Sequence, residues 1–194
     1  IGTFRIGVID RLDAIVYDNL IGWSRPQAPD DRIVIVDIDE KSLAEVGRWP
    51  WGRDRMAHLV NILFDRYGAA LVGFDVVFAE PDESSGLRSL ESLASGELRD
   101  NLAYQQALRE LRPRLDNDAQ FAEALRGRSV VLGFAMSHAT DAGSGVLPAP
   151  TLPAASFAGR ETAFTHWTSF AGNLAQFQRN AAAAGHMVPL FDAD

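Results

Sequence analysis

Apolar residues recur with two different spacings in the first part of the chain, and these spacings predict strands and helices in alternation. Mainly apolar runs at 33–38 and 71–77 are typical of strands that are covered on both faces. Between them, apolar residues at three- and four-residue steps predict a helix over 54–67 that ends at Gly68. A strand, a helix and a strand in this order form a βαβ unit, so we expect the two strands to be parallel neighbours.

The remaining patterns extend this alternation along the chain. In chain order they predict a short helix from Asp39 through Val46, an exposed loop at 80–96, a helix at 97–112 ended by Pro113, a short helix after Asp116 and Asp118, a strand at 130–136, a surface loop at 142–156, a helix at 170–184 and a strand at 187–191. The fold class predicted is therefore α/β, with a mostly parallel central sheet flanked by helices and a long amino-terminal helix.

The amino-terminal helix is predicted over residues 1–23. Ile9, Leu12, Val16 and Leu20 recur at helical steps, and they could face the chain's own domain or continue a helix from upstream, such as a membrane stalk or a dimer seam. The chain has no initiator Met and ends abruptly, so we expect a piece of a larger protein. We therefore divide it into this helix, continuing from a membrane segment, and a domain over 32–194 that is cut short at its carboxyl end.

Composition narrows the possible functions. Apolar residues make up 47% of the chain, which is enough for a substantial core. The net charge of −8 argues against nucleic-acid binding, which needs clustered Lys and Arg. The absence of Cys excludes disulfides, thiolate metal sites and cysteine catalysis. No apolar stretch approaches the roughly 20 residues that span a bilayer.

Three aspartates are the main candidates for chemistry. Asp37 and Asp39 lie two residues apart at the end of the first strand and leave the same face, and Asp75 lies in the second strand. Carboxylates at the carboxyl edge of a parallel sheet could bind a divalent cation, or the hydroxyls or amine of a ligand. Equally, Asp39 could only cap a helix, and Asp75 could only pair with Arg53 or Arg55. Both interpretations stay open.

Two further motifs each have two interpretations. Trp49-Pro50-Trp51 could close the core, or its indoles could form a wall of a pocket for a ring or a cation. The stretch from Asp116 to Asp118 begins like a calcium loop, but Phe121 stands where that loop needs Gly, which favours helix capping. The four histidines lack metal-ligand spacing, and no nucleophile, phosphate-loop or dinucleotide motif occurs.

The central block closely resembles the CHASE domain of type two. The matching motifs are Asp37-x-Asp39-Glu40, Ser42-Leu43, Gly47-x-Trp49-Pro50-Trp51-x-Arg53, and Gly73-Phe74-Asp75 leading to Phe78-x-Glu80. The resemblance covers 32–194, although the segment 84–114 is longer than the family pattern.

The resemblance implies an extracytoplasmic sensory module of a bacterial membrane receptor. Such modules belong to histidine kinases, adenylate or guanylate cyclases, and serine/threonine kinases, and membrane helices flank them. For this chain we expect no catalysis, a homodimer in the full-length receptor, no nucleic acid, and no cofactor other than a divalent cation. The predicted ligand-binding residues are Asp37, Asp39, Trp49, Trp51, Arg53 and Asp75, and the three aspartates would hold any metal. The alternatives are a small metal-binding or hydrolytic α/β domain and a purely structural dimerisation domain.

Overall fold

The computed structural model of the chain describes residues 16–17, 19–20, 22–23, 30–141, 143–157 and 165–187. The chain divides into two units, Ile1–Gly47 with Leu190–Asp194, and Arg48–Pro189. In the first unit, helix α2 (Glu40–Val46) begins after Asp39 and ends at Gly47, as predicted. Gly47 has a φ of 106°, a conformation that side chains disfavour, so a glycine is well suited to end the helix there.

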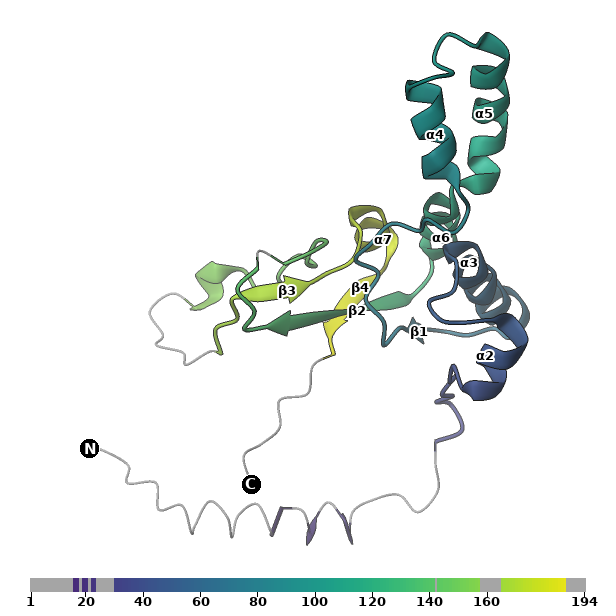
Figure 1. Ribbon diagram of the computed structural model, residues 1–194. Helices are drawn as coiled ribbons and strands as arrows, with labels where there is room; N and C mark the ends of the chain where they lie inside the picture. Colours follow the sequence, from purple (N-terminus) through teal and green to yellow (C-terminus); the bar gives the residue numbers. More distant parts are fainter. Residues whose placement is uncertain are drawn as a thin grey trace. The chain divides into compact units, whose positions relative to one another are not determined.

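The second unit contains the sheet and most of the helices (Figure 1). Its elements are α3 (Arg53–Asn61), the π-helical turn η1 (Ile62–Arg66), β1 (Val72–Gly73), α4 (Leu87–Ser95), α5 (Leu102–Leu115), α6 (Asn117–Leu125), β2 (Val130–Ser137), the 3-10 turn η2 (Ala154–Phe157), β3 (Ser169–Ala171), α7 (Ala175–Asn180) and β4 (Ala183–His186). Strands and helices alternate through much of this unit, which confirms the predicted α/β class.

Strand β2 is the central strand of the sheet. It pairs in parallel with β1, where Val72 lies opposite Val130, and in parallel with β4, where Ala184 lies opposite Leu132. The carboxyl half of β2 pairs with β3 in the antiparallel direction. The sheet is therefore mostly parallel, as the sequence predicts.

Helices α3, α6 and α7 enclose the hydrophobic core with β2. Four phenylalanines form its centre: the rings of Phe78, Phe121 and Phe177 are fully buried and contact one another edge to face, and Phe74 packs against them. Centroid separations of 5.0 to 6.1 Å are in the range that aromatic pairs favour. The predicted apolar face of the helix at 54–67 supplies Met56 and Val60, whereas Tyr67 at its end is exposed.

The first predicted strand does not form in the described residues. Residues 33–38 carry no strand, and the side chains of the run Ile33 to Val36 are 59% to 88% exposed. Strand β1 takes β2 as its parallel partner, which is the strand predicted third. An apolar run indicates that a segment tends to be covered, but the choice of hydrogen-bonded neighbour depends on packing across the whole sheet.

Three predictions of helices and loops need correction. The region 170–184, predicted as one helix, contains β3, α7 and the start of β4. Gly172 lies against the backbone of Val146, where a Cβ would collide, and Asn173 turns into the core, so the chain cannot continue as a helix there. The predicted loop at 80–96 contains α4, and α5 extends past Pro113 to Leu115. A proline near the end of a helix removes only one backbone hydrogen bond, so the neighbouring turns persist.

The long insertion between β1 and α6 forms a helical hairpin. Helices α4 and α5 pack side by side, and Tyr104 Oη donates to the carbonyl of Leu90 at 2.9 Å (Figure 1). Neither helix contains a fully buried residue. Most of the predicted amino-terminal helix, including Ile9 and Leu12, and the strand predicted at 187–191 beyond Met187 lie outside the described residues.

Candidate functional site

Asp39 is a helix cap in this structure. Its Oδ1 accepts hydrogen bonds from the Ser42 hydroxyl at 2.7 Å and from the Ser42 amide at 2.8 Å, and these two bonds lower the pKa of the Asp39 carboxyl. A side-chain acceptor at this position satisfies an amide that has no partner inside the helix. The capping role that the sequence left open for Asp39 is therefore confirmed, while its neighbour Asp37 is exposed.

The arginine pairing that the sequence left open for Asp75 does not form within the described residues. The residue is exposed, and it makes no hydrogen bond or ion pair with any part of the chain that the structure describes. Arg53 pairs instead with Asp118. Asp37 and Asp39 belong to the first unit and Asp75 to the second, so their convergence stays a prediction. Within the described ranges, no group of three or more His, Asp or Glu side chains is placed to hold a metal ion.

The two indoles of the Trp49-Pro50-Trp51 motif have different environments. Their rings contact edge to face, with centroids 5.9 Å apart, and the peptide bond between Trp49 and Pro50 is cis. Trp51 is half-buried and packs against the hydrophobic core, whereas Trp49 is 37% exposed. Trp51 therefore closes the core, and Trp49 presents an aromatic surface to solvent.

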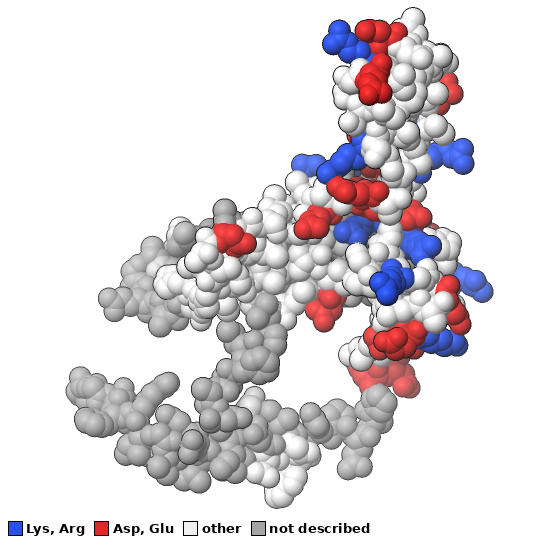
Figure 2. Space-filling view, in the orientation of Figure 1, with Lys and Arg blue, Asp and Glu red and all other residues white. Residues whose placement is uncertain are grey.

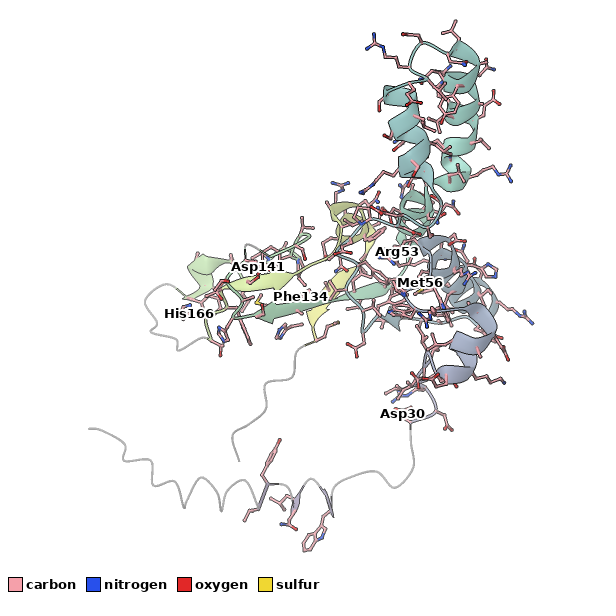
Figure 3. All side chains as sticks on the ribbon, viewed as in Figure 1. Asp30, Arg53, Met56, Phe134, Asp141 and His166 are labelled. Carbon is pink, nitrogen blue, oxygen red and sulfur yellow. The ribbon has the colours of Figure 1, made fainter. Side chains whose placement is uncertain are left out.

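Arg53 lies at the centre of a polar cluster between α3 and α6 (Figure 3). We call this group the Arg53 cluster; it comprises Arg53, Asp82, Ser84, Asn117 and Asp118. The Arg53 and Asp118 side chains are each only 12% exposed, and their Nε and Oδ1 atoms are 4.0 Å apart. The guanidinium also lies 4.7 Å from the centre of the Phe78 ring, at a distance where cation and ring attract.

Asp82 is the best-satisfied member of the cluster. Its Oδ2 accepts from the Arg53 amide at 2.7 Å and from Asn117 Nδ2 at 3.0 Å, and its Oδ1 accepts from the Ser84 amide at 2.7 Å. Burial alone would raise the pKa of Asp82, but the hydrogen bonds from Ser84, Arg53 and Asn117 outweigh burial and hold it below the ordinary value. This carboxylate therefore ties the first amide of α3 to the loop that follows Glu80.

Asp118 is less well satisfied than Asp82. Its Oδ2 accepts from the Asp82 amide at 3.1 Å, but its Oδ1 and Arg53 Nε are both buried without a hydrogen-bond partner in the described structure. Burial raises the pKa of Asp118 and lowers the pKa of Arg53, although their mutual attraction opposes both shifts. Bringing Nε and Oδ1 about 1 Å closer would form a hydrogen bond of ordinary length. In this structure the pair is held by charge attraction without a direct hydrogen bond between these two atoms.

Local sequence explains how these groups come together. Gly52 precedes α3, and a Cβ at this position would collide with Asp54 and crowd the Ser84 hydroxyl. Asp116 caps α6 by accepting from the Ala119 amide at 2.9 Å, as predicted, which leaves Asp118 available for Arg53. The sequence indicated capping for this pair of aspartates, but it contained no local signal for the distant partner.

A shallow hollow of about 850 Å³ lies beside the cluster, between α3 and α6. Its lining mixes polar and apolar side chains, and Arg128 at one side is bound to Asp65 at 2.8 and 2.9 Å and to Asn61 at 2.6 Å. Figure 2 shows acidic and basic side chains interspersed over these helices. Because Arg128 is already paired and charges of both signs are interspersed, this surface has no concentrated charge of one sign to select a charged ligand.

Comparison with known proteins identifies the family. The family model of the CHASE2 domain matches residues 1–194, which is the whole chain. No significant match was found among curated proteins or among solved structures. The match to the whole chain agrees with the motifs around Asp37, Trp49 and Asp75. The chain therefore belongs to the CHASE2 domain family, a family of extracytoplasmic sensory domains.

Proposed function

We propose that this chain is the sensory part of a membrane-bound receptor and transmits to a cytoplasmic histidine kinase, nucleotide cyclase or serine/threonine kinase. The match of the CHASE2 family across all 194 residues is the observation that supports the proposal. Within the described residues, no helix is long and apolar enough to cross a membrane. The alternative of a metal-binding or hydrolytic domain built on Asp37, Asp39 and Asp75 has no comparable support.

Chemical labelling in intact cells tests the location of the domain. The chain contains no Cys, so a single cysteine at the exposed position Leu102 can be introduced into a receptor whose other cysteines are replaced by Ser. We expect a membrane-impermeant maleimide to label Leu102→Cys in intact cells and to leave the Cys-free receptor unlabelled. Labelling that occurs only after cell lysis would contradict an extracytoplasmic location.

We propose that the signal is a small polar ligand or a divalent cation that binds at Asp37, Asp39, Trp49, Trp51, Arg53 and Asp75. The exposed carboxylate of Asp75 and the exposed ring of Trp49 support this assignment, because both present unused binding groups to solvent. Calorimetry with Ca²⁺, Mg²⁺ and small polar metabolites should detect binding that Asp75→Asn weakens by about tenfold or more. If no compound binds and Asp75→Asn leaves signalling unchanged, these residues have a structural role.

We propose that the receptor works as a homodimer with contacts through or beside residues 4–21. A two-fold interface would give a switch two arrangements, whose balance a ligand shifts by binding one of them better. The helical spacing of Leu12, Val16 and Leu20 supports this surface. Single cysteines at Leu12 and Val16 in the intact receptor should form crosslinks between copies under mild oxidation. A receptor that signals normally but forms no crosslink at any position along 4–21 would exclude this interface.

A further inference from the structure

The carboxyl end of β4 is held to β2 by a side chain as well as by the backbone. His186 lies opposite Phe134 in the parallel ladder, and the Met187 amide donates to the Phe134 carbonyl at 3.0 Å. Two residues further along β2, the Met136 amide donates to Nε2 of the His186 ring at 3.2 Å. The imidazole therefore supplies the next acceptor along β2, at the point where β4 ends.

This hydrogen bond depends on the charge of the His186 ring. A neutral imidazole has one acceptor nitrogen, whereas a protonated imidazole has two donors and no acceptor. On protonation, an N–H of the ring would face the N–H of Met136, and the attraction would become a repulsion between two donors. The bond is therefore present when the ring is neutral and is lost as the pH falls. Imidazoles as a class change charge between about pH 5 and pH 8.

The surroundings of His186 leave the ring accessible to protons. The residue is exposed, and its ring contacts Phe134 from β2 at 5.6 Å and Trp167, just before β3, at 5.8 Å between centroids. The titratable groups on these elements are His138, which stacks on Trp167 at 4.7 Å, together with His166 and Asp141. Asp141 is engaged by the Ser169 hydroxyl at 2.6 Å, and no carboxylate of the described chain forms an ion pair with His186.

We propose that His186 is a proton-sensitive latch, with the proton as a ligand of this domain. The neutral ring fastens the end of β4 to β2, and the protonated ring releases it. Release frees the carboxyl end of β4, at His186 and Met187, from β2. The latch lies beside Phe134 and away from Arg53 (Figure 3). Its conformational effect stands independently of the proposed receptor, and only its use as a signal rests on that function.

Amide hydrogen exchange of the 194-residue chain, followed by NMR, tests the latch. The quantity compared is the protection factor, because it corrects for the intrinsic effect of pH on exchange. The protection factors of the Met136 and Met187 amides should fall by about five- to tenfold between the neutral and the acid end of the imidazole range, as expected for one lost hydrogen bond. The Phe74 amide, which donates to Val131 on the β1 side of β2 at 2.9 Å, should keep its protection.

Substitutions separate His186 from the other histidines. His186→Gln replaces the acceptor nitrogen with an amide oxygen that does not titrate, so it should keep the protection and abolish the dependence on pH. His138→Gln is the matched control, because His138 stacks on Trp167 without bonding Met136, and it should retain the wild-type pH response. The proposal is overturned if wild-type protection at Met136 does not change with pH, or if His186→Gln shows the same change as the wild type.

Discussion

Phe121→Ala is expected to lower the free energy of unfolding by about 3 to 5 kcal/mol, the cost typical of removing a buried aromatic ring. The Phe121 ring is fully buried in α6 and lies 5.0 Å from the rings of both Phe78 and Phe177. Removing it opens a cavity where the segment after β1 and helices α6 and α7 meet. The surrounding rings come from different segments, so they cannot all move to fill that cavity.

Urea denaturation followed by circular dichroism measures this loss. Leu102→Ala is the control, because Leu102 in α5 is 83% exposed and its truncation should change stability by less than about 0.5 kcal/mol. Phe121→Leu keeps much of the volume and should fall between the wild type and Phe121→Ala. Equal losses for the variants at Phe121 and at Leu102 would mean that the four phenylalanines do not form the core.

Arg53→Met is expected to cost about 3 to 5 kcal/mol, because it leaves a buried carboxylate without its counter-charge. The Met side chain keeps the packing over Phe78 but removes the positive charge beside Asp118 and Asp82. Two carboxylates would then repel each other in a poorly hydrated position. Arg109→Met, at an exposed position of α5, is the matched control for a lost arginine.

Asp118→Asn should recover part of that loss. In the Arg53→Met background it removes the uncompensated charge, and its amide oxygen still accepts from the Asp82 amide. We expect the double variant to be more stable than Arg53→Met by about 1 kcal/mol or more, as for residues in direct contact. Strict additivity of the two substitutions, measured in a double-mutant cycle, would show that the Arg53 cluster is not energetically coupled.

The raised pKa of the Asp118 carboxyl also predicts the direction in which the stability of the fold changes with pH. Burial raises the pKa of Asp118, so the folded chain binds this proton more tightly than the unfolded chain does. Its contribution favours folding at acid pH and is lost as the pH rises through the raised pKa. Asp118→Asn cannot titrate, so its stability relative to the wild type should increase between the acid range and neutrality. A difference that runs in the opposite direction would mean that the ion pair with Arg53 outweighs burial.

Much of the local structure could be predicted from the sequence, because it depends on neighbours in the chain. The helix after Asp39 begins with a capping aspartate and ends at a glycine, and both signals lie within ten residues. The apolar spacing of Met56 and Val60 identified the buried face of α3. The mainly apolar run at 130–136 identified β2. The family motifs likewise lie close together in the sequence, so they identified the family without the fold.

Tertiary structure alone decided which distant segments meet. Asn173 is fully buried, and its side chain accepts from the Phe78 amide, 95 residues away in sequence, and donates to the Gly133 carbonyl. It lies in a region whose local pattern favoured a helix. From the sequence alone, Arg53 could pair with any of several carboxylates. The packing of α3 on α6 selects Asp118 over Asp75. The spacing of apolar residues indicates which face of a segment tends to be buried. The partners of buried polar groups follow from the minimisation of unpaired donors and charges over the whole folded chain.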